Sequence, residues 1–151
     1  MACWGGNEST QLGNGTSVDN TPHPDPTILS GLTNVVAIEE RFLTGFAIDG
    51  TANVYAWGWS SNGATGTGND DTAVACGIGM CTPKPRLVPA LEGTVQLAST
   101  RAGGIARKRD GTIWVWGIND LGQLGHAPRD GDATCRDGPC RTTPAPLAGL
   151  P

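Results

Sequence analysis

The chain has 151 residues, including 23 Gly and 11 Pro, and a formal net charge of −4. The acidic balance argues against a nucleic-acid surface, which normally carries a basic patch, and no apolar run reaches the roughly 18 residues that a membrane-spanning helix needs. Abundant Gly and Pro with only 16% charged residues favour short strands joined by turns over long amphipathic helices.

A Trp-Gly dipeptide occurs three times, and in each copy a second Gly follows nine positions after the Trp. The residues that keep this spacing are Trp4, Gly5 and Gly13, then Trp57, Gly58 and Gly66, then Trp116, Gly117 and Gly125. A repeat of this length predicts a propeller or a solenoid. We divide the chain into units of approximately 1–53, 54–112 and 113–151, and we expect the three equivalent Trp side chains to pack between blades.

The same run of elements follows in each complete unit. First strands are predicted at 35–38 and 94–97, second strands at 46–48 and 105–107, and third strands at 53–57 and 112–116. Asp49-Gly50 and Asp110-Gly111 indicate hairpin turns between the second and third strands, since Gly accepts a positive φ. A Pro-punctuated fourth strand is predicted at 27–29, 86–88 and 145–147. Proline is tolerated at sheet edges, so this strand is expected to be the outer one.

Four strands repeated in this way predict an all-β fold, a β-propeller with blades of four antiparallel strands. The residues around the motif also resemble a known family. Residues 116–125 and 3–13 are similar to the signature of regulator-of-chromosome-condensation (RCC1-like) repeats, and the resemblance covers essentially the whole chain. It implies a ring of about seven blades, so three repeats are expected to form a partial propeller, a fragment of a longer one. Family members usually carry small glycines and often a His between the first two strands, and segments 39–44 and 98–103 both lack the His.

Two cysteine pairs share one spacing. Cys76 and Cys81 lie 19 and 24 positions after Trp57, and Cys135 and Cys140 lie at the same distances after Trp116. We predict two local disulfides, which would place the protein in an extracellular or periplasmic compartment. A metal site formed by both pairs, or two reduced pairs, are the alternatives. The fifth cysteine, Cys3, is expected to be a small buried residue in a strand.

The candidate binding residues are few. Trp59 has no Trp counterpart in the other units, and it would be a binding residue if it is exposed. Asp130, Asp132 and Asp137 surround the second cysteine pair; a solvated acidic loop is the expectation and a calcium site the alternative. No catalytic constellation, resident metal or cofactor is predicted, because neither of the two His residues stands in a recognisable active-site motif.

The functional hypothesis is a non-catalytic propeller scaffold that binds a protein partner or other copies of itself. Open strand edges would supply β-augmentation, and the cysteine loops would form the variable contact surface. One alternative is a guanine-nucleotide exchange factor for a small GTPase, the best-known activity of the resembled family. Another is a polysaccharide-binding propeller or enzyme, which a cluster of exposed Trp and carboxylates would favour. No nucleic acid and no membrane span are expected.

Overall fold

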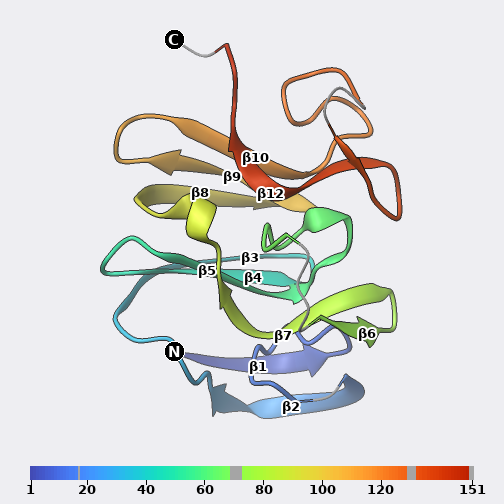
Figure 1. The fold of residues 1–151 in the computed structure, drawn as a ribbon. Coiled ribbons are helices and arrows are strands. Elements are labelled where there is room, and N and C mark those ends of the chain that lie inside the picture. Colours follow the sequence, from blue (N-terminus) through green and yellow to red (C-terminus); the bar gives the residue numbers. More distant parts are fainter. Residues whose placement is uncertain (17, 69–72, 129–131, 150–151) are drawn as a thin grey trace.

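The chain forms three antiparallel sheets stacked on one another (Figure 1), in a computed structural model that describes residues 1–16, 18–68, 73–128 and 132–149. The first sheet pairs β1 (Ala2–Asn7) with β2 (Asp19–Ile28). Within the described residues the helical elements are two 3-10 turns, η1 (Ser61–Gly63) and η2 (Pro89–Leu91). No helix in this part of the chain has the length and apolar character to cross a bilayer.

The second and third sheets share one strand order. The second sheet runs β3-β4-β5-β7-β6 and is formed by β3 (Val35–Arg41), β4 (Thr44–Asp49), β5 (Val54–Trp59), β7 (Gly79–Leu87) and β6 (Val74–Cys76). The third sheet, from the opposite edge, consists of β8 (Thr94–Thr100), β9 (Gly103–Lys108), β10 (Ile113–Ile118), β12 (Pro139–Pro146) and β11 (Ala133–Thr134). Each therefore has the four long strands that the sequence predicts. The Pro-rich β7 and β12 are the outermost of the four long strands, as expected. The edge position itself is a correction, because the cysteine-bearing insertions add the short β6 and β11 outside the first residues of β7 and β12.

The sheets and the sequence units are out of phase. β3 and β4 belong to unit 1–53, whereas β5 and β7 belong to unit 54–112. The third sheet likewise takes β8 and β9 from one unit and β10 and β12 from the next. Every sheet with four long strands is therefore held together by two consecutive units, which joins the units along the stack.

The Trp-Gly dipeptide stands at the same irregularity in all three sheets. The outer pairing breaks register between Cys3 and Gly5, between Ala56 and Gly58, and between Val115 and Gly117. The Gly after each Trp has a positive φ, 112° at Gly5, 90° at Gly58 and 100° at Gly117, a region that L side chains rarely adopt. The bulge that this Gly permits explains why the dipeptide recurs.

The predicted hairpin turns lie where the sequence places them, with one correction. Asp49 Oδ1 accepts hydrogen bonds from the backbone N–H of Thr51 at 2.9 Å and from its hydroxyl at 2.7 Å, and Asp110 holds Thr112 in the same way. The positive φ of the first turn falls on Ala52 (66°) and not on Gly50. The carboxylate, more than the glycine, thus fixes this turn.

The core consists of apolar layers between adjacent sheets, and the Trp side chains of β5 and β10 are central to them. Trp57 and Trp116 are 2% and 1% exposed. Trp57 Nε1 donates to the carbonyl of Gln11 at 2.8 Å, and Trp116 Nε1 donates to the carbonyl of Ala64 at 3.1 Å. Both acceptors belong to the preceding unit, so each indole ties its sheet to the unit before it.

Trp4 departs from the expected blade packing, because 64% of its side chain is exposed. The physical reason is the direction of the Trp contact. The rings of Trp57 and Trp116 cover Gly13 and Gly66 of the preceding unit, where an added Cβ would lie 2.6 Å and 3.1 Å from a ring carbon. Trp4 lies in the first sheet, and the described residues include no earlier unit for it to cover.

Candidate functional site

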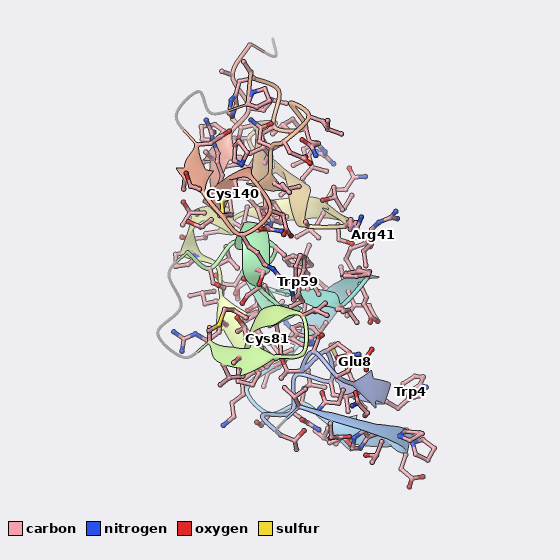
Figure 2. All side chains as sticks on the ribbon, turned by 90° about the vertical axis from the view of Figure 1, so that its right-hand side faces the viewer. Trp4, Glu8, Arg41, Trp59, Cys81 and Cys140 are labelled. Atoms are coloured by element: carbon pink, nitrogen blue, oxygen red, sulfur yellow. A yellow bond between two sulfur atoms is a disulfide. The ribbon has the colours of Figure 1, made fainter. Side chains whose placement is uncertain are left out.

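Both predicted disulfides are present, and each closes a short hairpin. Cys76–Cys81 joins β6 to β7 with a Cα–Cα distance of 6.0 Å, and Cys135–Cys140 lies at the start of β12 with a Cα–Cα distance of 5.8 Å. The hairpins lie on the same side of the molecule, where Cys81 and Cys140 are found one above the other (Figure 2). We call this side, with the two hairpins and the β3–β4 and β8–β9 turns, the hairpin face.

Direct contacts hold the two hairpins together. The Arg136 guanidinium donates to the carbonyl of Ile78 in the first hairpin. Asn62 Nδ2 donates to Asp137 Oδ2 at 2.6 Å, and the Asp137 N–H donates to Asn62 Oδ1 at 3.1 Å. Asp137 was predicted as a binding residue; in the structure its carboxylate fixes the second hairpin on the second sheet.

Asp132, another of the acidic candidates, is buried among polar partners. Its side chain is fully buried, with Oδ2 accepting from Asn119 Nδ2 at 2.6 Å and Oδ1 lying 3.4 Å from both His126 Nε2 and Arg141 Nε. These partners make Asp132 a buried anchor of the loop before β12 and leave it closed to an external ligand. Asp130, the third acidic candidate, lies outside the described residues. Among the residues the structure describes, no three His, Cys, Asp or Glu side chains are grouped to hold a metal ion.

Trp59 was predicted to bind a ligand only if it is exposed, and the structure shows that it is buried. Its side chain is 6% exposed and packs against Cys81 and Ala102, and its Nε1 donates to the carbonyl of Ile78 at 3.4 Å. The indole is therefore part of the apolar layer under the first hairpin. One side of it nevertheless lines a cleft between the two hairpins and the β3–β4 and β8–β9 turns.

This cleft has a volume of about 810 Å³ and opens on the hairpin face. Phe42, in the β3–β4 turn, lies edge-on to Trp59 with 6.0 Å between ring centroids. Arg101, at the tip of the β8–β9 turn, places its guanidinium carbon 5.7 Å from the centre of the Phe42 ring. Ile78 and Leu121 add exposed apolar side chains to the lining. Two turns distant in sequence thus form one aromatic and cationic surface.

Phe42 is also conformationally unusual. Its φ is 61°, in the left-handed region that bulky side chains rarely occupy, and it is 52% exposed. Sequence reasoning did not select Phe42 or Arg101 as binding residues. A signal was present, since both lie in the segments 39–44 and 98–103 that depart from the resembled family.

A second hollow, of about 540 Å³, lies between β1 and the β3–β4 hairpin. Trp4 and Trp57 border it, and its charged lining residues are Glu8, Glu39 and Glu40. Cys3 also lines it and is half-buried, so it fits the expected small strand residue only in part. Burial raises the pKa of the Cys3 thiol, and the nearby Glu40 carboxylate raises it further. The thiol is therefore held in its protonated, weakly reactive form.

The repeated sheets, the Trp contacts between units and the bulged Trp-Gly strands define a segment of a β-propeller. No family model matches the chain. The chain is 32% identical over 102 residues to Protein RCC1 of Candida albicans, covering 66% of this chain and 21% of that protein. It is 33% identical over 131 residues to the ultraviolet-B receptor UVR8 of Arabidopsis thaliana, covering 83% of this chain and 27% of the receptor.

A solved structure of Prp20p from Saccharomyces cerevisiae, described with its binding properties to Gsp1p and histones, superposes with a TM-score of 0.81. The superposition covers 98% of this chain and 34% of that one at 17% identity, which supports the fold alone. Together the sequence and fold likenesses place this chain in the RCC1-like repeat family, as the motif predicted. The chain spans about a third or less of the length of each of these proteins.

Proposed function

We propose that this chain is a non-catalytic propeller segment that binds a peptide segment of a protein partner in the cleft of the hairpin face. The observation that carries the proposal is Phe42, a bulky aromatic residue held half-exposed at a positive φ beside Arg101. A left-handed conformation costs a non-Gly residue about 1–2 kcal/mol. Such strain at an exposed site is typical of residues retained for contact with a ligand.

The chemistry of the cleft indicates the kind of segment that fits. Phe42, Ile78 and Leu121 are exposed apolar residues around it, and Leu121 is 85% exposed. Arg101 provides a cation beside them, and Arg side chains over aromatic rings are common at interface hot spots. We therefore expect a ligand with an apolar or aromatic side chain next to a carboxylate. The second guanidinium of the lining, that of Arg136, is engaged by the Ile78 carbonyl and lies 3.7 Å from the Asp137 carboxylate.

The disulfides support both the rigidity of the site and its location. They close the hairpins that wall the cleft, so little ordering of these walls is needed when a ligand binds. Disulfides persist in oxidising compartments, and we propose an extracellular or periplasmic site of action for that reason. A propeller scaffold with rigid loops on a single face is a common arrangement for binding.

Selection of peptides from a displayed library on the folded, oxidised chain tests the proposal. Binders should contain an apolar residue beside an acidic one, and Arg101→Ala should weaken them at least tenfold, a loss of about 1.4 kcal/mol. Lys108→Ala is the matched control, because Lys108 Nζ lies 3.9 Å from the centre of the Trp114 ring in a similar cation–π pair away from the cleft. Equal weakening by both variants, or by neither, would contradict the site.

A second candidate function is nucleotide exchange on a small GTPase, which the sequence likeness to Protein RCC1 favours. Fluorescent nucleotide release from a loaded GTPase distinguishes it from the scaffold: the scaffold leaves the release rate unchanged, and an exchange factor accelerates it by orders of magnitude. The polysaccharide alternative has a narrower basis than the sequence suggested, because Trp59 is buried and only Trp4 of the two is exposed, beside the Glu8 and Glu40 carboxylates.

A further inference from the structure

Two Asn residues stand in a sequence pattern that the proposed binding role does not use. Residues 7–9 (Asn-Glu-Ser) and 14–16 (Asn-Gly-Thr) both follow the Asn-x-Ser/Thr pattern at which secreted proteins receive N-linked oligosaccharides. So short a pattern also arises by chance, and a usable acceptor must in addition have an accessible amide on a surface loop. The structure separates the two patterns on this criterion.

The first pattern is closed in the folded chain. Asn7 is 0% exposed and Ser9 is 1% exposed. Asn7 Nδ2 donates to the Thr16 hydroxyl at 2.9 Å, and Asn7 Oδ1 accepts from the Leu12 N–H at 3.4 Å. A sugar joined to Asn7 Nδ2 would have to displace the residues packed around it, so the folded chain cannot carry one there.

The second pattern is open. Asn14 is partly exposed, and both Gly15 and Thr16 are exposed. Asn14 Oδ1 accepts from the Thr16 N–H at 3.0 Å and from the Thr16 hydroxyl at 2.6 Å, which makes an Asx turn. Among the described residues, no group accepts a hydrogen bond from Asn14 Nδ2. The turn thus holds the carbonyl end of the amide and leaves its nitrogen free for an incoming sugar.

The buried pattern supports the exposed one. The Thr16 hydroxyl accepts from Asn7 Nδ2, and its own proton is therefore left to donate to Asn14 Oδ1. Asn7 thus fixes the turn that presents Asn14.

The repeat determines where this loop lies. The Gly15 N–H donates to the carbonyl of Pro83 in β7 at 2.9 Å, and the equivalent Gly68 N–H donates to the carbonyl of Thr142 in β12 at 2.8 Å. β7 and β12 are the outermost long strands of their sheets. Each loop therefore crosses onto the outer side of the following sheet, and Asn14 stands at this side of the stack.

The acceptor amide belongs to one unit only. At the position of Asn14, ten residues after the Trp of the motif, the other units have Thr67 and His126. The Thr67 and Thr65 hydroxyls lie 2.8 Å apart in a hydrogen bond, and His126 Nε2 lies 3.4 Å from the buried Asp132 carboxylate. Neither Thr67 nor His126 has an amide nitrogen to modify, so the pattern is a feature of this loop and not of the repeated frame.

We propose that Asn14 is an N-glycosylation site, which accepts an oligosaccharide from a polyprenyl diphosphate donor. In the transfer, a bond forms between Asn14 Nδ2 and the anomeric carbon of the first sugar, while the bond from that carbon to the diphosphate oxygen breaks. The lipid diphosphate leaves with the electron pair of the broken bond, and Nδ2 gives up one proton to a base of the transferase. The inference rests on the proposed extracellular location, because this modification belongs to secreted proteins.

The oligosaccharide would lie apart from the cleft of the hairpin face. No residue before Phe42 lines that cleft, whereas the loop of Asn14 is attached to Pro83 on the outer strand β7. An N-linked sugar is a bulky, strongly hydrated group. It would keep the outer side of the first two sheets in solvent and leave the cleft open to a partner.

Secretion of the chain behind a cleavable leader, in a eukaryotic cell line that attaches N-linked oligosaccharides, tests the site. Mass spectrometry of intact glycopeptides should find sugar on Asn14 in most of the secreted, oxidised chain and none on Asn7. Asn14→Gln and Thr16→Ala should each abolish the modification, and Thr16→Ser, which keeps the pattern and the hydroxyl, should retain it. Ser9→Ala is the matched control, because it removes the first pattern at a hydroxyl that has no hydrogen-bond partner among the described residues.

Three results would overturn the inference: an unmodified Asn14 in the secreted, oxidised chain, sugar on Asn14 that persists in Thr16→Ala, or loss of the sugar in Ser9→Ala.

Peptide binding by the same secreted protein separates this inference from the proposed function. An unmodified Asn14 in a chain that forms both disulfides and binds library peptides through Arg101 overturns the glycosylation site alone. A modified Asn14 in a chain whose library binding is indifferent to Arg101→Ala overturns only the cleft. Asn14→Gln should leave the affinity for library peptides unchanged.

Discussion

Trp116 and Trp4 occupy the same motif position, yet their replacement by Ala should have very different effects on the free energy of unfolding. Trp116 is 1% exposed, packs on Phe46 with 5.8 Å between ring centroids, and donates to the Ala64 carbonyl at 3.1 Å. Burial of about 200 Å² of indole at about 25 cal/mol per Å² amounts to about 5 kcal/mol as an upper value. A cavity then forms in a layer with little room to collapse, so we expect Trp116→Ala to cost about 4 kcal/mol.

Trp4 is 64% exposed, so only about a third of the same area is covered and Trp4→Ala should cost about 1.7 kcal/mol at most. Urea unfolding followed by circular dichroism at constant protein concentration measures both values. Trp116→Phe, which keeps an aromatic ring, provides an intermediate variant if Trp116→Ala does not fold. Equal costs for the two Ala variants would refute the reasoning that each Trp derives its burial from the preceding unit.

Three further predictions concern the disulfides, the turns and the buried carboxylate. Removing one bridge by Cys76→Ala with Cys81→Ala should lower the free energy of unfolding by about 2 kcal/mol, and reduction of the native chain should raise its intact mass by about 4 Da, two hydrogens for each bridge. Burial raises the pKa of Asp49, but hydrogen bonds from Thr51 and Asn53 outweigh it and lower the pKa to about 2. The stability that this carboxylate contributes is complete above its unfolded-state pKa of about 3.9 and is lost as pH falls through about 2. Asp49→Asn should therefore make the free energy of unfolding depend less on pH between these two values. An unchanged pH dependence would contradict the role of Asp49 in the turn. Asp132→Ala should lower the free energy of unfolding by about 3 kcal/mol, measured by thermal or urea unfolding, because Arg141 loses its buried partner. A loss below about 0.5 kcal/mol, which is usual for surface positions, would make Asp132 a candidate ligand-binding residue again.

The frame of this fold could be predicted from the sequence because it is periodic. Equal spacing of the Trp-Gly motif located β5 and β10, and equal cysteine offsets located both bridges. Trp4 shows where the reasoning by equivalence stops: the three Trp residues share a local conformation, but burial depends on the neighbouring unit. Local sequence determines the bulge, whereas the order of units along the stack determines the packing.

The candidate site could not be predicted in the same way, because it is formed between units. Phe42 and Arg101 come from turns 59 positions apart and meet only because their sheets stack. Trp59 is covered by Phe42 and by the first hairpin, a contact with no local signal. The sequence predicts that Asp132 lies in a solvated acidic loop, because its pairing with His126 and Arg141 depends on how one loop closes and has no local signal.

The Trp contact also gives the stack of units a direction. Each Trp reaches back to the unit before it, to a carbonyl seven positions after that unit's own Trp and a Gly two positions further. In the last unit these positions are held by Gln123 and Gly125, which are both exposed, unlike the buried Ala64 and Gly66. The burial of the motif is therefore set by both neighbouring units: the Trp of a unit is buried by the unit before it, and its second Gly is buried by the Trp of the unit after it.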